Sequence, residues 1–435
     1  MVDSTKHISS VLQYLNDNVE YALLRNFENL PHDNSGRDID IIIPIGEFRK
    51  HRKAIIQTLT QDQWSIFSYH HDSRMTTFIC AKIMADYVEF VQWDFFFDTS
   101  IHGIRLLSAQ KMTDSRQFNG VLYHVSKEYE FLDKYLYCKV VGAAYPEKYK
   151  KTRDLVEHSE IVESELKRNF GCNNTFETDR ISGKKLLLRS LWGNLKRSPI
   201  RTPFRLLRSI FIYLQPFFRS NNTPTISFTG ADGAGKTTII ELFKDKTSRL
   251  YGKATINFHF RPTLIPNLGE VAHRSKFKKE VDQEYEKPHR SHMKGVLSSF
   301  FRLFYYTWDY LIGYVLRVKK HSRRMVIFDR YYTDMIVDSR RSSIYLSSKF
   351  LYYWGRMFIP RMRYNFLITA HPDIILSRKQ ELDRKAIEKI NSKMELLAKK
   401  KGYYLIENNS TAQEAVIEIL SLIIEKQHKR NMKRL

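Results

Sequence analysis

One glycine-rich run constrains what this chain can fold into more than any other feature. The residues Gly230-Ala-Asp-Gly-Ala-Gly-Lys-Thr-Thr238 fit the pattern GxxxxGK[ST] and stand between an apolar stretch and a helix-forming one. Such glycines let successive backbone N–H groups converge on phosphate oxygens, and the helix that follows adds its positive end. We therefore expect a strand, a phosphate-binding loop and a helix, with Lys236 on the β- and γ-phosphates and Thr237 on Mg²⁺. The expected nucleotide-binding residues are Gly230, Ala231, Asp232, Gly233, Ala234, Gly235, Lys236, Thr237 and Thr238.

The residues around this run alternate between strand-like and helix-like patterns. This alternation is typical of a parallel sheet flanked by helices, so we expect an α/β domain here. The expected strands are Thr225–Thr229, Thr255–Phe260, Met325–Phe328, Asn365–Thr369 and Tyr403–Ile406.

A second candidate motif is Met325-Val-Ile-Phe-Asp-Arg-Tyr-Tyr332. Its apolar strand places Asp329 and Arg330 at a carboxyl end, which is the ligand-binding edge of an open parallel sheet. We expect Asp329 to hold Mg²⁺ or to orient a phosphate acceptor, and Arg330 to neutralise a phosphate. The alternative is a surface ion pair.

These two motifs together resemble the thymidylate-kinase-like branch of P-loop kinases, over about residues 224–427. The resemblance implies an enzyme that uses ATP and Mg²⁺, with Lys236, Asp329, Arg330 and Arg378 as its catalytic residues. It also implies that Asp232, Arg261 and Arg330 face the acceptor. Arg261 belongs to His259-Phe-Arg-Pro262, which stands where that family has Arg-Glu-Pro, and Asn408–Val416 resembles the closing turn near the adenine.

The sequence differs from that family where thymine is recognised, because Thr333–Arg341 replaces the glutamine-containing stretch. It resembles instead kinase homologues encoded with bacterial capsule and lipopolysaccharide genes. We therefore expect an ATP-dependent phosphotransferase whose acceptor is a sugar or lipid-linked glycan in surface polysaccharide assembly. A nucleoside monophosphate kinase and a nucleic-acid-binding P-loop ATPase remain as alternatives. Scattered basic residues without a nucleic-acid-binding signature argue against the last.

The first part of the chain carries a separate carboxylate pattern. Asp38 and Asp40 lie two apart on a predicted strand, so both face one way while Ile39 and Ile41 face a core. Asp94, on a second predicted strand, is a candidate third ligand for Mg²⁺. The pattern resembles the nucleotidyltransferase fold over about residues 20–145, which implies an α+β domain. The usual Gly-Ser element is replaced by Leu24–Pro31, so a binding or regulatory module without catalysis, and a plain surface strand end, stay open.

Charge divides the chain unequally. The net charge is −4 up to residue 180 and +28 after it, and residues 181–222 hold nine Lys and Arg but no Asp or Glu. Interleaved aromatic and aliphatic residues make this segment a candidate for contact with an anionic membrane, and a linker packed on one domain is the alternative. We expect residues 295–316 to form a buried helix rather than a membrane span, because Arg302 and Asp309 interrupt it.

The length of 435 residues suggests two or three domains. We expect a nucleotidyltransferase-like domain at 1–150, a basic helical linker at 151–222 and a kinase domain at 223–435. Three widely spaced cysteines and the lack of a secretory signal lead us to expect a cytoplasmic protein, with peripheral contact at the inner membrane face if the basic segment binds lipid. The sequence does not indicate an oligomeric state.

Overall fold

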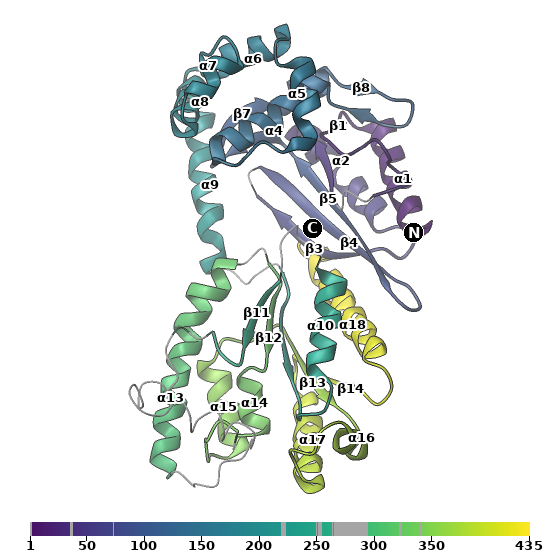
Figure 1. Ribbon diagram of the computed structural model, residues 1–435, viewed down its shortest axis with the longest axis vertical. Coiled ribbons are helices and arrows are strands. Elements are labelled where there is room, and N and C mark those ends of the chain that lie inside the picture. Colours follow the sequence, from purple (N-terminus) through teal and green to yellow (C-terminus); the bar gives the residue numbers. More distant parts are fainter. Residues whose placement is uncertain are drawn as a thin grey trace. The chain divides into compact units, whose positions relative to one another are not determined.

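The computed structural model describes residues 2–34, 38–72, 74–218, 223–248, 250, 255–262, 264, 295–321, 324–339 and 341–435. The chain divides into two compact units, shown in Figure 1. Unit 1 comprises Met1–Lys82, Glu89–Gln215 and Gln427–Leu435. Unit 2 comprises Ile83–Val88 and Pro216–Lys426.

Unit 1 is built on a mixed sheet with helices on both faces. The sheet has seven strands in the order β3-β4-β5-β2-β1-β9-β8, and β6 and β7 pair separately. In chain order its elements are α1 (Val2–Asn18), β1 (Ala22–Leu23), β2 (Asp38–Ile42), α2 (Ile45–Leu59), β3 (Ser65–His71), β4 (Met75–Ile83), β5 (Val88–Phe96), β6 (Asp98–Ile101), β7 (Ile104–Ser108), α3 (Ala109–Asp114), β8 (Gln117–Phe118), β9 (Tyr123–His124), α4 (Lys127–Val141), η1 (Glu147–Tyr149), α5 (Lys150–Val156), α6 (Glu160–Phe170), α7 (Thr175–Arg180), α8 (Gly183–Arg197) and α9 (Arg201–Phe218).

Alternation along β2 places one apolar core on each face of this sheet. Ile39 and Ile41 pack into a cluster with residues of α1 and α2, as their spacing predicts. Ile42 belongs to a second cluster, formed largely by residues of α3, α4, α6 and neighbouring strands. Because Asp38 and Asp40 alternate with Ile39 and Ile41, they lie on the same face as Ile42.

The end of the chain completes unit 1. Asn431 Nδ2 donates to the carbonyl oxygens of Ile66 and Phe67, at 3.0 and 3.1 Å. The backbone N–H of Ile66 donates to His428 Nδ1 at 3.0 Å. Residues at the two extremes of the sequence therefore share one folded unit.

Unit 2 is a five-stranded sheet in the order β11-β12-β10-β13-β14, and each adjacent pair is parallel. In chain order its elements are β10 (Thr225–Thr229), α10 (Lys236–Thr247), β11 (Ile256–His259), α13 (Val296–Gly313), η3 (Tyr314–Val318), η4 (Lys319–His321), β12 (Val326–Asp329), α14 (Tyr332–Val337), α15 (Ser348–Phe358), β13 (Tyr364–Thr369), α16 (Pro372–Arg378), α17 (Arg384–Ala398), β14 (Tyr403–Glu407) and α18 (Ala412–Met432).

The sheet of unit 2 confirms the α/β fold expected from the sequence, and the predicted strands agree with the observed ones to within one residue at each end. Helix α10 packs against β10 and β12, and α17 against β13 and β14. The strands that follow β10 lie first on one side of it and then on the other. An open parallel sheet binds ligands at the carboxyl ends of its strands at such a reversal.

Helix α13 differs from the expectation of a buried helix. Leu303 and Tyr310 are fully buried, but Leu297, Phe301 and Trp308 are exposed. Apolar residues occur all around this helix, so hydrophobicity alone does not reveal which face packs against the described part of unit 2. Among the described residues, we find no helix that combines the length and apolar character needed to cross a membrane.

Candidate functional site

The glycine-rich run forms a loop between β10 and α10, at the central strand of the unit 2 sheet. Gly235 has φ +86°, and a Cβ added there would lie 2.3 Å from Asn408 Nδ2. Only glycine fits this left-handed and crowded position. The first N–H groups of α10 have no partner within the helix, and Thr237 and Thr238 are exposed at this end. The loop and helix therefore present donors suited to an anion.

Lys236 is buried against its own loop. Its Nζ donates to the carbonyl oxygens of Gly230 and Ala231, at 2.8 and 2.7 Å, and lies 3.8 Å from a carboxylate oxygen of Asp232. Burial, and then the nearby Arg330, lower the pKa of Lys236 to about 7. Phosphate oxygens placed in the loop would favour the charged lysine over the neutral one.

Asp232 joins the loop to two arginines of other segments. Its carboxylate accepts hydrogen bonds from Arg330 and, at 2.5 Å, from Arg341. Burial alone would raise the pKa of Asp232, but Arg330, Lys236 and Arg341 outweigh it and lower the pKa well below the usual range. Asp334 accepts a second set of bonds from Arg330, at 3.1 and 3.2 Å, and fixes its guanidinium from the other side.

Asp329 ends β12 beside the loop strand. Its carboxylate lies 3.4 Å from His259 Nδ1, at the end of the neighbouring strand β11. Burial would raise the pKa of Asp329, but His259, Arg330 and Lys236 together lower it. An ionised, half-exposed carboxylate at the carboxyl edge of the sheet is a suitable oxygen ligand for Mg²⁺.

Asn408 and Arg378 line the other side of the loop. Asn408 Nδ2 donates to the Ala234 carbonyl at 2.9 Å, while Asn408 Oδ1 is buried and has no hydrogen-bond partner among the residues that the structure describes. Arg378 ends α16, and its Nη1 would lie 3.6 Å from a Cβ at Gly235. The glycine cradle and the cations fit the phosphates of a bound nucleoside triphosphate. Lys236, Thr237 and Thr238 are the residues that would hold these phosphates.

Arg261 lies in a buried pair rather than at the exposed edge. Its Nη1 donates to Asp309 Oδ2 at 2.8 Å, and its guanidinium stacks over Tyr306. Both members of the pair are almost fully buried. Breaking a buried pair by removing one partner is strongly destabilising, so this contact also anchors α13 to the segment after β11. Acceptor contact by Arg261 stays a prediction.

A second candidate site lies in unit 1. β2 and β5 are parallel neighbours in which Asp40 is opposite Asp94. One oxygen from each of Asp38, Asp40 and Asp94 lies within 4.8 Å of the others. The structure thus brings together three residues that the sequence separates, in a donor set suited to a hard cation.

Surrounding groups hold these carboxylates in place. Arg25 Nε is 2.7 Å from Asp40, and Thr77 and Gln92 donate to Asp94 at 2.6 and 2.9 Å. Burial raises the pKa of Asp40 to about 7, since the neighbouring carboxylates add to burial and outweigh Arg25. Burial likewise raises the pKa of Asp94 to about 6. A divalent cation would relieve this repulsion.

Sequence reasoning did not assign roles to several residues of these sites. Arg341 and Asp334 lie within the Thr333–Arg341 stretch that departs from the resembled family, and Asn408 lies in a segment assigned only by resemblance. Arg25 falls in the Leu24–Pro31 stretch. An arginine or asparagine in a loop carries no periodic signal, and its partner is set by tertiary structure.

Comparison with known proteins gives structural likeness only. No protein-family model and no curated protein matches the chain. A thymidylate kinase from Ehrlichia chaffeensis is similar with a TM-score of 0.33 and 15% identity, over 46% of this chain and 98% of that one. A thymidylate kinase from Candida albicans is similar with a TM-score of 0.32 and 17% identity, over 48% of this chain and 95% of that one. The assignment of unit 2 to the parallel α/β folds rests on its own sheet order and glycine-rich loop.

Proposed function

We propose that unit 2 is a Mg²⁺- and ATP-dependent phosphotransferase. In the reaction, an acceptor hydroxyl oxygen forms a bond to the γ-phosphorus and its proton passes to solvent, the bond to the β–γ bridging oxygen breaks, and ADP leaves. Such transfer depends mainly on positioning and on neutralising charge. The observation that carries the proposal is that Lys236, Arg330 and Arg341 converge around Asp232 at the carboxyl edge of a parallel sheet.

Each residue has a separate task. When ATP binds, Lys236 gives up its hydrogen bonds to the two loop carbonyls and bonds to the β- and γ-phosphates instead. Arg378, at the end of α16, adds a second positive charge there. Thr237 and Asp329 hold Mg²⁺, which withdraws charge from the phosphates when bound. Asp232 aims Arg330 and Arg341 at the side from which the acceptor enters.

The proposed acceptor is a sugar or lipid-linked glycan of a surface polysaccharide. Support comes from the residues after Arg330, where Thr333 and Asp334 are buried and Asp334 binds Arg330. That stretch therefore holds the arginine, and it contains no glutamine to recognise a thymine ring. A lipid-linked acceptor would be met at a membrane surface, which suits the basic segment 181–222.

The test is transfer of label from γ-labelled ATP, with Mg²⁺, to two acceptor pools. The first holds nucleoside monophosphates and the second a glycolipid extract of bacterial envelopes. Label in the glycolipid pool, lost at least about 100-fold in Lys236→Ala and kept in Lys244→Ala on the same helix, is the expected result. Label only in the monophosphates would reassign the protein as a nucleotide kinase. Hydrolysis stimulated only by polynucleotide would favour the nucleic-acid-binding ATPase.

A second candidate function concerns unit 1. The three carboxylates within 4.8 Å favour a nucleotidyltransferase-like domain that uses Mg²⁺. In such a transfer an acceptor hydroxyl oxygen bonds to the α-phosphorus and its proton passes to solvent, the bond to the α–β bridging oxygen breaks, and pyrophosphate leaves. Label from α-labelled nucleotide in the product, lost in Asp40→Asn while γ-label transfer persists, is expected. No transfer of α-label with any of the four common nucleotides would leave the domain a binding module.

A further inference from the structure

Helix α9 packs on unit 1 through its polar side. Thr202 Oγ1 donates to the Asn194 carbonyl at 3.0 Å, and Arg205 Nη2 donates to Asn194 Oδ1 at 3.2 Å. One turn further on, Ser209 lies close to Gly103, where an added Cβ would be 3.1 Å from the Ser209 Cβ. The spacing of three and four residues places Thr202, Arg205 and Ser209 on one face of the helix.

The opposite face of α9 is apolar and exposed. Phe204, Leu207, Phe211 and Leu214 follow one another at the same spacing, and their exposed fractions are 70%, 63%, 61% and 45%. We call these four residues the outer stripe. They are offset by about two residues, or about 200°, from the packed face. A helix on a soluble domain normally buries its apolar face and exposes its polar one, and α9 does the reverse.

Positive charge surrounds this stripe. Arg201 and Arg208 are exposed on α9 beside it, and no Asp or Glu occurs between residues 181 and 222. The preceding helix α8 exposes Trp192 and Leu188 among lysines and two arginines. Aromatic and aliphatic side chains set among cations are typical of helices that lie in the plane of an anionic membrane surface.

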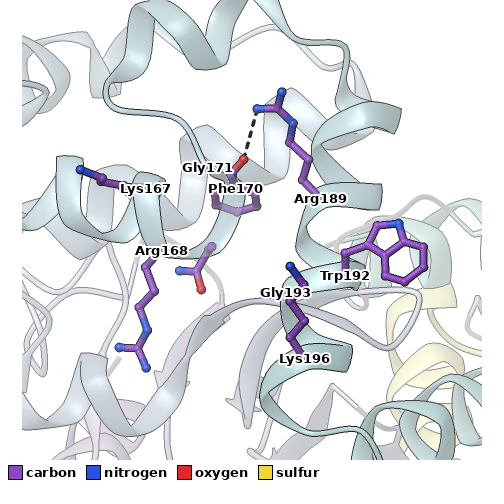
Figure 2. A pocket seen from close by; sticks show the side chains of 9 residues that line it. Lys167, Arg168, Phe170, Gly171, Arg189, Trp192, Gly193 and Lys196 are labelled. Carbon is purple, nitrogen blue, oxygen red and sulfur yellow. Dashed lines mark hydrogen bonds between the residues drawn. The ribbon is translucent and has the colours of Figure 1, made fainter.

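A basic pocket lies between α6 and α8 of the same unit. Figure 2 shows Arg189 donating to the Phe170 carbonyl at one wall, while Lys167 and Lys196 border the pocket elsewhere. This hydrogen bond is 3.3 Å long. The pocket has a volume of about 420 Å³, and no carboxylate is among the described residues that line it. Its lining is Lys167, Arg168, Asn169, Phe170, Gly171, Arg189, Trp192, Gly193 and Lys196. These cations suit a phosphate-bearing headgroup.

We propose that α9 docks unit 1 on an anionic lipid surface, with the outer stripe at the boundary between headgroups and acyl chains. The arginines beside it and the pocket between α6 and α8 contact the headgroups. The positive charge of this segment favours an anionic lipid surface over a second copy of this chain. A second copy would bring the same basic segment, which holds no Asp or Glu, and the two segments would repel each other. The inference does not rest on phosphate transfer, so it stands or fails separately from the proposed function.

The test is flotation of the full chain with vesicles, without nucleotide. We expect binding to vesicles of phosphatidylglycerol mixed with phosphatidylcholine, weaker binding at 0.5 M than at 0.1 M salt (roughly 4 and 10 Å screening lengths), and little binding to phosphatidylcholine alone. Phe204→Ser with Phe211→Ser should lower partitioning at least about tenfold. Tyr213→Ser is the matched control, because Tyr213 is 75% exposed but lies outside the outer stripe. It should change partitioning less than about twofold.

Several results would overturn the proposal. These are equal binding to neutral and anionic vesicles, equal loss in the control variant, or no vesicle binding at all. Self-association of the wild-type chain in sedimentation velocity, lost in the Phe204/Phe211 variant, would assign the stripe to a second copy. Thermal unfolding of each variant shows whether unit 1 stays folded. Lys236→Ala should bind vesicles like the wild type, which separates this surface from the nucleotide site.

Discussion

The guanidinium of Arg330 donates to the carboxylate of Asp232, and this bond links the residue after β12 to the loop after β10. Arg330 has φ +68°, an uncommon backbone conformation for a residue with a side chain. Such a backbone conformation persists where surrounding contacts stabilise it. Here Asp232 and Asp334 form ion pairs with the guanidinium from two sides. The position of Arg330 is therefore set before any ligand arrives.

Removing the charge of Asp232 should destabilise unit 2. Asp232→Asn leaves Arg330, Arg341 and Lys236 close together without their shared counter-charge, and we expect a loss of about 3 kcal/mol in the free energy of unfolding. Saturating inorganic pyrophosphate should restore much of it, since an anion in the loop replaces the lost charge. Thermal and urea unfolding measure both effects.

The matched control for this variant is Asp245→Asn, an exposed aspartate on α10. It should change stability by less than about 0.5 kcal/mol. Destabilisation that pyrophosphate does not relieve would show that the Asp232 carboxylate has a packing role only.

Gly235→Ala should weaken ATP binding at least about tenfold. The new Cβ would meet Asn408 Nδ2 at 2.3 Å and would also hold a left-handed backbone, so the loop must shift. Isothermal titration with ATP in Mg²⁺ measures the change. Adding Asn408→Ala to this variant should recover part of the affinity, because it removes the clash but not the backbone strain. Gly295→Ala, where a Cβ meets open space, should bind like the wild type.

Nucleotide binding should take up a proton above neutral pH. Burial lowers the pKa of Lys236 to about 7, so at pH 8 most of the unliganded protein carries a neutral lysine. Phosphates raise that pKa again, and binding at pH 8 should take up close to one proton, roughly 0.9, against roughly 0.1 at pH 6. Isothermal titration calorimetry at each pH, in two buffers of different ionisation enthalpy, gives the number of protons taken up on binding. A binding heat that does not depend on the buffer at pH 8 would contradict this role of Lys236.

Divalent cation binding to unit 1 should strengthen as pH rises from 5.5 to 8. Asp40 and Asp94 have pKa values raised to about 7 and about 6, so at low pH a cation must displace their protons. Without a cation, a rise in pH has the opposite effect on the stability of the fold. The folded protein holds these carboxyl protons more tightly than the unfolded chain does, so it becomes less stable as pH rises through the raised pKa values. Mg²⁺ should therefore raise the unfolding temperature most at pH 8.

Variants separate this effect from a general salt effect. Asp40→Asn and Asp94→Asn should lose the Mg²⁺-dependent stabilisation, while Asp114→Asn, exposed on α3, should keep it. Equal stabilisation at pH 5.5 and pH 8 would show that the cation binds elsewhere.

Local patterns predicted much of this molecule. β10, its glycine-rich loop and the start of α10 are adjacent in sequence, and each has a distinct local signal. Ile39 and Ile41 face a core because the strand period alone decides it. Asp40 lies opposite Asp94 only because β2 and β5 pair in one particular register. The sequence does not determine that register, and the two carboxylates were only a hint that the strands are neighbours.

Other features depend on packing between distant segments. Arg341 reaches Asp232 from a turn with no periodic signal, and Arg261 finds a buried partner in Asp309, in α13. The hydrophobic pattern of α9 shows that the helix is amphipathic, but only its contacts with Asn194 show that the polar side faces the protein.

The contribution of residues 427–435 to unit 1 affects how the protein is made. Asn431 and His428 bond to the β3 backbone, so unit 1 can complete its native contacts only after the ribosome has translated all of unit 2. A nascent chain holding residues 1–215 must therefore wait with part of β3 uncovered, where chaperones can recognise it. Unit 1 contains segments from both sides of unit 2 in the sequence. A single recombination crossover would therefore split unit 1 and cannot replace one whole unit by a homologous one.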